Sequence, residues 1–261
     1  MSTMAKMLIM HHLPEVNDLP ALERWFWQHH CPEVLHQAPW LTRYVMYRAV
    51  PAPTGAENFG YFNYRVHENW VRNPEERRGT NGCISMTVQP APMRVIVAHI
   101  PAEPTEDFMG ADMRYGEKTI LRWVTVFRYP DGVSAEEGDD WYLKVHVPEV
   151  MQQPGLIRFF SHKAINNKQQ SPLPHSAKLK PFFDDSGPLF FKQWHRVSEL
   201  WYENSNGWVD SISKASLQYT KPAWAKQEQY PFLEPGNDFV STFLLERPDQ
   251  DMLRTFMPSY I

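Results

Sequence analysis

The sequence predicts an α+β fold in which two tandem βαββαβ repeats pack their sheets against each other. Two observations support this: an internal repeat, and the alternation of apolar stretches with helical periodicity inside each copy. The chain has 261 residues, enough for two domains of ordinary size. Trp25–Leu35 (WFWQHHCPEVL) matches Trp141–Met151 (WYLKVHVPEVM) without a gap, so His146 corresponds to His30 at an offset of 116 residues.

The repeat continues beyond this segment. The pattern F-x5-R-V-x-E-x-W occurs at Phe59–Trp70 and again at Phe190–Trp201, an offset of 131 residues. The pattern E-P-x-x-D-F occurs at the same offset, at Glu103–Phe108 and Glu234–Phe239. These matches predict that residues 1–112 and 113–261 form two equivalent domains.

The larger offset of the later matches indicates an insert in the second copy. The insert falls at residues 166–189, which align with the much shorter segment 51–58 of the first copy. The insert contains four prolines and the segment FFDDSG. We expect it to be an ordered cover on the second domain, with a plain connecting loop as the alternative.

Each copy is predicted as strand, helix, strand, strand, helix, strand. The first strand of each copy is a continuous apolar stretch, as expected of a strand buried on both faces, and the second strand shows alternation. The first helices have helical periodicity, and Ser134 with Glu137 forms a capping box. The predicted elements of the first copy are Met4–His12, Leu19–Ala38, Leu41–Val50, Tyr61–Val66, Glu68–Arg78 (weakened by Pro74) and Met93–Ile100. Those of the second are Ile120–Tyr129, Ser134–Gln153, Leu156–Ile165, Phe190–Val197, Ser198–Leu217 and Asp238–Glu246.

Two such units are two ferredoxin-like halves. A four-stranded sheet with helices on one face leaves its other face bare and apolar, so that face must be covered. The second copy on the same chain is the obvious cover. The sequence therefore predicts a fused α+β barrel with pseudo-two-fold symmetry.

Composition excludes several classes of function. The net charge is −4 and no run of lysine or arginine exceeds a pair, so nucleic acid is not an expected partner. No apolar stretch is long enough to span a membrane, and two cysteines cannot build a disulfide framework. We expect a cytoplasmic, globular protein. Aromatic residues make up 14% of the chain, which indicates either an aromatic-lined cavity or aromatic core filling.

The motifs resemble a known superfamily. A helix with W-x4-H-x-P, followed by P-G-L-x-R-F at the start of a strand, is similar to EthD-like proteins of the dimeric α+β barrel superfamily. Trp141, His146 and Pro148 fill the first motif, and Pro154–Phe159 fills the second. The first copy departs from it with Trp40 in place of glycine. The resemblance implies the barrel fold and chemistry that is commonly cofactor-independent, in catabolic or polyketide pathways. The superfamily also includes polyketide cyclases, muconolactone isomerases, monooxygenases and haem proteins, so fold alone does not assign the reaction.

Two helical histidines are candidates for acid–base chemistry. His30 and His146 are each followed two residues later by proline, which bends the helix, and three residues later by Glu33 or Glu149. A carboxylate within hydrogen-bond reach would orient the imidazole and raise its pKa, as suits a general base. The alternative is that both histidines pack at symmetry-related positions.

Differences between the copies also indicate function. Tyr64 corresponds to His195, and strand alternation predicts both on the face opposite Arg65 and Arg196. These two side chains could supply a donor and a base to one pocket between facing sheets. The alternative is a buried polar residue that is satisfied structurally.

Other histidines lie near strand ends. His11 and His12 replace Phe127 and Arg128 of the second copy, and one of the pair must point inward in a regular strand. His67 and His99 are also near strand ends, where we expect them to be exposed to solvent.

Sequence motifs for metals and cofactors are missing. There is no H-E-x-x-H, no G-x-G-x-x-G, no phosphate-binding P-loop and no G-x-S-x-G nucleophile elbow. Cys31 lies beside His30 in sequence but about 100° around the helix from it. We therefore expect no metal, no cofactor and no covalent intermediate.

The predicted function is a cofactor-independent enzyme that performs acid–base chemistry (a lyase, cyclase, hydratase, dehydratase or isomerase) on a hydrophobic aromatic or cyclic carbonyl compound. The alternatives are a haem protein or cofactor-free oxygenase of the same fold, and a non-catalytic small-molecule-binding protein. The predicted catalytic residues are His146, His195, Tyr64 and His30, and the predicted substrate-binding residues are Trp25, Trp141, Arg65, Arg196, Trp194 and His12.

One main site in the second half is favoured. The second half has P-G-L after its helix and carries the insert at 166–189, which could exclude water. There His146 or His195 would take the proton. The first half has a competing claim in His11, His12 and Tyr64. Association into a homo-oligomer is left open.

Overall fold

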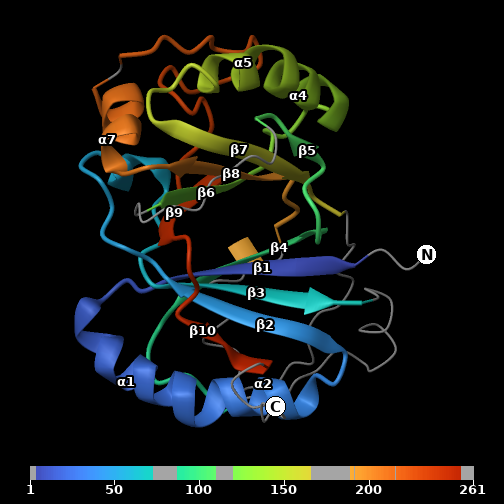
Figure 1. Ribbon diagram of the computed structural model, residues 1–261, viewed down its shortest axis with the longest axis vertical. Helices are drawn as coiled ribbons and strands as arrows, with labels where there is room; N and C mark the ends of the chain where they lie inside the picture. The colour runs from blue at the N-terminus through green and yellow to red at the C-terminus, as the bar shows by residue number, and fades with distance from the viewer. Residues whose placement is uncertain are drawn as a thin grey trace.

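Two five-stranded antiparallel sheets lie face to face, with helices on the two outer faces, in the computed structural model (Figure 1). The model describes residues 4–72, 87–109, 120–165, 189–190, 192–214 and 216–253. The strand orders are β10-β2-β3-β1-β4 and β5-β7-β8-β6-β9, so the two sheets have the same topology. This confirms the predicted α+β fold of two ferredoxin-like units packed sheet to sheet.

The first sheet contains β1 (Ala5–His12), β2 (Leu41–Arg48), β3 (Arg65–Val71), β4 (Arg94–Pro101) and β10 (Gln250–Asp251). The second contains β5 (Glu106–Asp107), β6 (Leu121–Phe127), β7 (Leu156–Lys163), β8 (Arg196–Tyr202) and β9 (Phe239–Leu245). Of these, β1, β2, β4, β6, β7 and β9 lie where the apolar stretches predicted strands.

The first helix of each half is continuous and contains a π-helical turn just before its proline. In the first half α1 (Leu19–Trp25), the turn Phe26–His30 and α2 (Cys31–Gln37) follow one another. In the second half the equivalents are α4 (Ala135–Trp141), the turn Tyr142–His146 and α5 (Val147–Val150). The wide turns accommodate the missing N–H of Pro32 and Pro148. Ser134 caps α4 by accepting a hydrogen bond from the Glu137 N–H at 3.1 Å, as the sequence predicted.

The second helix predicted in each half is wrong at its start. The segment predicted as helix from Glu68 is strand β3 up to Val71, and the remainder of that prediction lies mostly outside the described residues. The helix predicted from Ser198 is strand β8 up to Tyr202, followed by the short α7 (Ser205–Trp208) and a π-helical turn. Polar residues on these strands face a second buried layer, so they do not show the apolar pattern of a strand. The insert at 166–189 lies outside the described residues except for Leu189.

Each half gives its last short strand to the sheet of the other half. Strand β5 follows β4 in the chain but pairs with β7, and β10 follows β9 but pairs with β2. This exchange corrects one repeat match. Glu103–Phe108 follows the last long strand of its half, whereas Glu234–Phe239 precedes it, so the shared E-P-x-x-D-F pattern is not an equivalence. The true equivalents are β5 and β10, in which Asp107 and Asp251 form ion pairs with Arg158 and Arg43.

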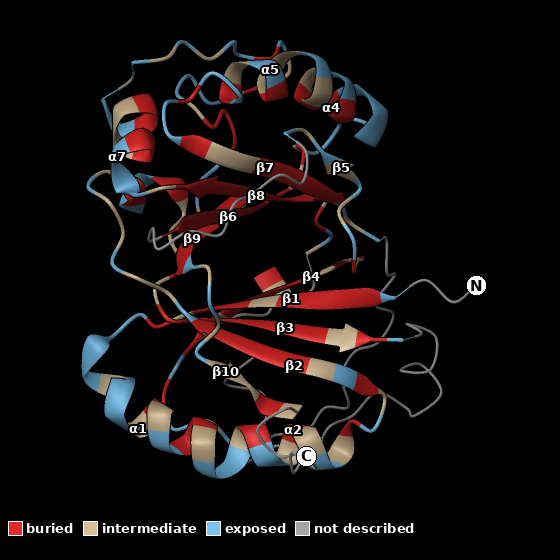
Figure 2. Ribbon diagram, in the orientation of Figure 1, coloured by how far each residue is buried: buried red, intermediate tan, exposed pale blue. Residues whose placement is uncertain are grey.

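The interface between the sheets is an apolar core to which both halves contribute (Figure 2). Its strand residues include Leu8, Met10, Val66, Ile96, Val124, Val126, Val197 and Val240. A second apolar core lies between the first sheet and its helices, and a third lies between the second sheet and its helices. The strands are therefore buried on both faces, as the continuous apolar stretches predicted.

Backbone hydrogen bonds also join the two sheets at their sides. Ser241 N–H donates to Gly60 O at 3.0 Å, and Ile165 N–H donates to His99 O at 2.8 Å. Gly60 has φ +59°, and a Cβ there would lie 2.4 Å from the Phe239 carbonyl oxygen, so only glycine fits this approach. Among the described residues, no helix has the length and apolarity needed to cross a membrane.

Candidate functional site

Three histidines, of which His11 and His67 are buried and His30 is half-buried, gather around Phe26 between the first sheet and its helix. The ring of Phe26 lies 4.6 Å from that of His30, 5.0 Å from that of His67 and 5.9 Å from that of His11. The rings of His11 and His67 are 4.6 Å apart because β1 and β3 are neighbouring strands. The sequence prediction that one of His11 and His12 points inward holds for His11, which is 5% exposed.

The exposure predicted for His67 is wrong, since it is 1% exposed. Its strand is covered by the helix on one face and by the second sheet on the other. A histidine on β3 therefore has no route to solvent, although it stands near the end of the strand that the sequence predicted.

Several polar atoms of this cluster are buried without a hydrogen-bond partner among the described residues. They are Nδ1 of His11 and of His30, Nε2 of His67, the hydroxyl of Tyr64, and Nε and Nη1 of Arg65. A buried polar group that lacks a partner costs about 1–3 kcal/mol, so native proteins contain few of them. Their concentration on one side of one sheet indicates a site for a polar ligand.

Burial keeps the histidines of this cluster neutral. It lowers the pKa of His11 to about 3 and that of His30 to about 4, and it lowers the pKa of His67 well below its ordinary 6.5. The prediction that Glu33 raises the pKa of His30 is therefore wrong in its outcome, because burial outweighs the carboxylate.

Glu33 and Glu149 bind threonines rather than the histidines. Glu33 accepts hydrogen bonds from the N–H of Thr87, at 2.8 Å, and from its hydroxyl. Glu149 binds Thr220 in the same way, at 3.0 Å from its N–H. The tryptophans that begin the two motifs donate to the carbonyls of the same threonines, at 2.9 Å in the first half and 3.2 Å in the second. The repeated W-x4-H-x-P-E pattern thus anchors a loop to the helix in both halves.

A directional chain of hydrogen bonds orients His67. Its Nδ1 lies 3.3 Å from the Tyr44 hydroxyl, which lies 3.9 Å from the Cys31 Sγ. The Cys31 thiol in turn donates to Met46 Sδ at 3.9 Å.

A thioether has no proton to give, so the Cys31 thiol is the donor to Met46. The other two contacts follow the tautomer of His67: with its proton on Nδ1, His67 donates to Tyr44 and Tyr44 donates to Cys31. In this tautomer Nε2 of His67 carries no proton, so it is an acceptor.

Arg65 supplies the positive charge of the cluster. Its Nη2 donates to both carboxylate oxygens of Glu23 at 2.7 Å, and its guanidinium carbon lies 5.3 Å from the ring centres of Phe26 and Trp27. The same guanidinium lies 5.3 Å from the ring of Tyr64, and burial raises the pKa of that phenol to about 12.

The prediction that Tyr64 and Arg65 occupy opposite faces is wrong. Regular alternation begins only at Arg65, the first residue of β3, and Tyr64 precedes the strand in a bend. Both side chains therefore lie on the helix side of the first sheet.

The equivalent region of the second half has fewer polar side chains, and its arginine is fully paired. His11, Tyr44 and His67 are replaced by Phe127, Phe159 and Ser198. Arg196, the counterpart of Arg65, donates to Asp139 at 2.7 Å. It also donates to further acceptors, so all its nitrogens are paired.

His146 lies among aromatic rings in the second half. The rings of Trp141, Tyr142 and Tyr230 are centred 5.1, 5.4 and 5.6 Å from it. Burial lowers its pKa to about 3, and its Nδ1 has no partner among the described residues.

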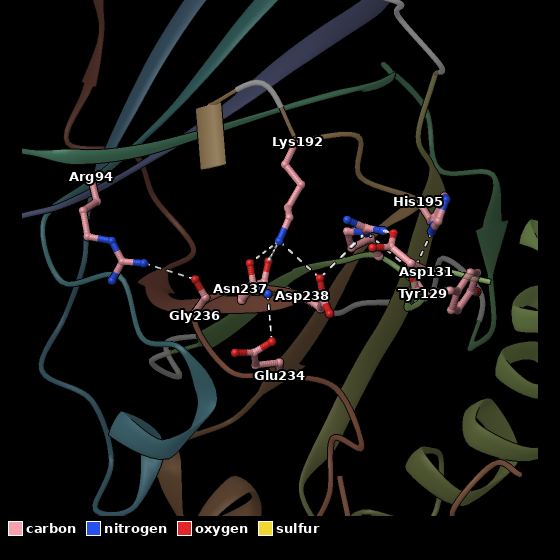
Figure 3. A network of polar contacts seen from close by, with 10 residues as sticks. Arg94, Tyr129, Asp131, Lys192, His195, Glu234, Gly236, Asn237 and Asp238 are labelled. Carbon is pink, nitrogen blue, oxygen red and sulfur yellow. Dashed lines mark hydrogen bonds and ion pairs between the residues drawn. The ribbon is translucent and has the colours of Figure 1, made fainter. Parts of the chain in front are cut away.

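The remaining predicted residues are dispersed. His195 stacks on Tyr129 at 5.0 Å, and its Nδ1 accepts a hydrogen bond from the Tyr129 N–H at 2.8 Å (Figure 3). Trp194 belongs to the core between the sheets, and His12 packs on Phe62 of that core. The structure does not bring Tyr64 and His195 into one pocket, because each lies in its own half.

A polar pocket of about 340 Å³ lies next to His195. Its charged groups neutralise one another (Figure 3): Lys192 donates to the Asn237 carbonyl at 2.7 Å and to Asp238 at 3.2 Å. Arg128 pairs with Asp131 and Asp238. These contacts fix the loop that leads into β9, so we place the candidate site at the histidine cluster instead. Among the described residues, no group of three potential ligands is arranged to hold a metal ion.

Sequence reasoning identified Tyr64, Arg65, His30 and Trp25 of this site but missed His67, Tyr44 and Cys31. Trp25 packs 5.0 Å from His30. The chain from His67 to Cys31 crosses two strands and a helix, so no local pattern could have revealed it. The sequence offered one signal: the second half has different residue types, Val147, Phe159 and Ser198, at the positions equivalent to Cys31, Tyr44 and His67.

Comparison with known proteins gives one family match. The model of the chalcone isomerase N-terminal domain matches residues 2–101, which include the whole histidine cluster. No curated protein matches the chain.

Similar solved structures include an anthrone oxidase-like protein, 9% identical with a TM-score of 0.46, which covers 94% of this chain and 91% of its own. They also include a mutant chlorite dismutase from Candidatus Nitrospira defluvii, 5% identical with a TM-score of 0.39, covering 94% and 92%. At these TM-scores neither likeness supports an argument about function.

Proposed function

We propose that the first half holds the active site of a cofactor-independent isomerase-type enzyme that transfers protons on an aromatic ketone bearing a phenol. His67 is the general base, and Arg65 with Tyr64 stabilises the oxyanion. The observation that carries this proposal is the buried, unpartnered Nε2 of His67, whose other nitrogen is held by Tyr44; the tautomer with its proton on Nδ1 makes Nε2 an acceptor.

The proposed base and the proposed oxyanion donors share one neighbour. His67 lies 5.0 Å and Arg65 5.3 Å from the ring centre of Phe26. A nucleophile or base oriented by a third group, close to donors for a developing charge, is the arrangement that proton-transfer enzymes use. Removal of water from this buried region strengthens both interactions.

The proposed reaction is the isomerisation of an α,β-unsaturated aryl ketone that bears a phenol. Nε2 of His67 takes the phenol proton, and the phenolate oxygen forms a bond to the β-carbon while the C=C π bond breaks. The negative charge moves to the enolate oxygen, where the guanidinium of Arg65 and the hydroxyl of Tyr64 stabilise it. The imidazolium returns the proton to the α-carbon, so substrate and product are isomers.

We infer the substrate class from the aromatic side chains beside the histidine cluster and from the family match. Phe26, Trp25 and Trp27 offer aromatic faces, which favour a flat apolar ligand. The matched domain is named for chalcone isomerase, and a chalcone is an aryl ketone. The resemblance to EthD-like proteins, whose chemistry is commonly cofactor-free, supports the same reaction type.

The geometry favours this site over the second-half site that the sequence favoured. His146 is surrounded by aromatic rings, and Arg196, the counterpart of Arg65, has all its nitrogens paired. His195 stacks on Tyr129, and its Nδ1 already accepts a hydrogen bond from the Tyr129 N–H. We therefore assign the proton transfer to His67, with His11 and His30 as neutral neighbours.

The test compares His67→Gln with His162→Gln in the isomerisation of a hydroxychalcone. Both histidines are on strands and 1% exposed, but His162 packs beside Phe160, remote from the proposed base. Loss of a general base should lower turnover by on the order of 10²–10⁴. His162→Gln should keep turnover per folded molecule, with folding checked by circular dichroism.

A second pair of variants decides between the halves. His30→Ala should reduce activity, because it opens the wall beside Phe26 and His67, whereas His146→Ala should not. Activity that is lost in His146→Ala and intact in both His30→Ala and His67→Gln would place the site in the second half and overturn this proposal.

A further inference from the structure

Arg65 and Arg196 hold equivalent positions but have different partners. Nη2 of Arg65 binds Glu23, and its Nε and Nη1 have no partner among the described residues. Nε of Arg196 binds Asp139, the counterpart of Glu23, at 2.7 Å. Nη1 of Arg196 has two more acceptors at 2.9 Å, one of which is a second carboxylate.

The second carboxylate comes from the exchanged strand. Glu106 on β5 accepts from Nη1 and Nη2 of Arg196, and Ser161 on β7 accepts from Nη1. Glu106 and Ser161 are register partners in the β5–β7 ladder. Glu106, a residue of the first half of the chain, thus accepts hydrogen bonds from the guanidinium of Arg196 in the second half.

The first sheet has neutral residues at both of these places. Gln250 on β10 is the register partner of Met46 on β2, as Glu106 is of Ser161. Met46 in turn faces His67 across the β2–β3 ladder, as Ser161 faces Ser198 across the β7–β8 ladder. The pair Gln250 and Met46 therefore replaces the two acceptors that satisfy Arg196.

We propose that Gln250 keeps the guanidinium of Arg65 open for an oxyanion of the substrate, a phenolate or an enolate. Glu106 closes the equivalent site of the second half. This inference deepens the proposed function and rests on it for the position of the site. Gln250 acts as a specificity-determining residue, because a carboxylate in its place would occupy the donors that the ligand needs.

The charge of the site does not exclude an anionic ligand. Arg65 and Arg48 both contact the carboxylate of Glu23, Arg48 also pairs with Asp249, and the three histidines are neutral at pH 7. Nη1 of Arg65 carries two N–H donors, its counterpart in Arg196 donates to Glu106, and hydrogen bonds to charged groups are among the strong ones. In the second half the carboxylates of Asp139 and Glu106 already accept from the guanidinium, so no donor is left for an anionic ligand.

The test measures binding of p-nitrophenol, whose phenolate has its own visible absorption band, with p-nitroanisole as the neutral analogue. The wild-type chain should bind one phenolate, more tightly than the anisole. Gln250→Glu should weaken phenolate binding about 10–100-fold, the equivalent of a hydrogen bond to a charged group, and leave anisole binding unchanged. Glu106→Gln, the reciprocal change in the second half, should keep wild-type affinity.

The opposite charge keeps the test decisive if Gln250→Glu fails to fold by circular dichroism. Gln250→Lys should then bind the phenolate at least as tightly as wild type. Wild-type phenolate affinity in folded Gln250→Glu, or weaker binding in Gln250→Lys, would overturn the inference. Phenolate binding that follows the charge at position 250, without turnover of a hydroxychalcone, would instead count against the proposed function alone.

Discussion

Lys6 in the first sheet and Glu199 in the second form a buried ion pair across the interface, with 3.9 Å between Nζ and Oε1. Their counterparts Arg122 and Glu68 form the reciprocal pair at 3.5 Å, and each cation also contacts the glutamate of its own sheet. Four charges that sum to zero therefore lie where the pseudo-two-fold axis relates the halves. Within an apolar interface they fix how the two sheets are aligned.

Removal of one charge from this group should destabilise the fold strongly. We expect Glu199→Ala to lower the free energy of unfolding by about 3–5 kcal/mol, because it leaves two buried cations to share the single carboxylate of Glu68. Chemical denaturation measures the change. Asp140→Ala is the control: it breaks an exposed pair with Lys144 and should cost less than about 1 kcal/mol. Equal effects of the two substitutions would contradict a structural role for the buried group.

The activity should persist at lower pH than an ordinary histidine base would allow. Burial holds the pKa of His67 well below 6.5, so its imidazole stays neutral as the pH falls through 6.5. We expect kcat/KM to be flat through that region, with its acid limb at lower pH. A limb centred near pH 6.5 that disappears in His67→Gln would mean that the base is exposed to water in the working enzyme.

Stability should fall with acid because of His146. Burial lowers its folded-state pKa to about 3 from an ordinary 6.5, so below pH 6.5 the unfolded chain binds a proton that the folded chain does not. Its contribution is present in full above pH 6.5 and is lost progressively as the pH falls towards 3. At pH 5 the loss should be about 2 kcal/mol. His146→Phe should remove that part of the slope in denaturation measured between pH 7 and pH 5; an unchanged slope would contradict the assignment.

Separating the halves should expose the core between the sheets. We expect chains cut between residues 110 and 115 to give two fragments that are insoluble or associate with each other, because each sheet then presents its apolar face to water. Co-expression should recover a soluble pair. Light scattering of the separate and mixed fragments measures this, and two monodisperse, folded monomers would rule out the shared core.

The sequence predicted the strands whose buried residues are apolar, and it failed for the strands that bury polar residues as well. Strand β1 is apolar along most of its length, so both its type and its bounds were found. Strand β3 places His67 towards the helix and Glu68 towards the ion group between the sheets, so its buried polar residues resembled a helix start. A polar residue whose partner lies on the other repeat gives no local signal.

The same limit applies to the site. Tyr64 and Arg65 were found because they differ from, or repeat, their counterparts His195 and Arg196. His67 depends on Tyr44, which reaches it across the β2–β3 ladder, and that relation exists only after folding. The role of Gln250 needed the exchange of β5 and β10, which the mistaken match of Glu234–Phe239 had concealed.

The exchange of β10 also delays completion of the first sheet during synthesis of the chain. Met46 on β2 pairs with Gln250, so the first sheet has an unoccupied edge until the ribosome has made nearly all of the second half. Loop closure over such a separation is slow compared with pairing of neighbouring strands. The first sheet therefore spends most of translation with β2 as an open edge that could pair with another nascent chain. A chaperone that holds nascent strands should raise the yield of this protein more than its final stability would suggest.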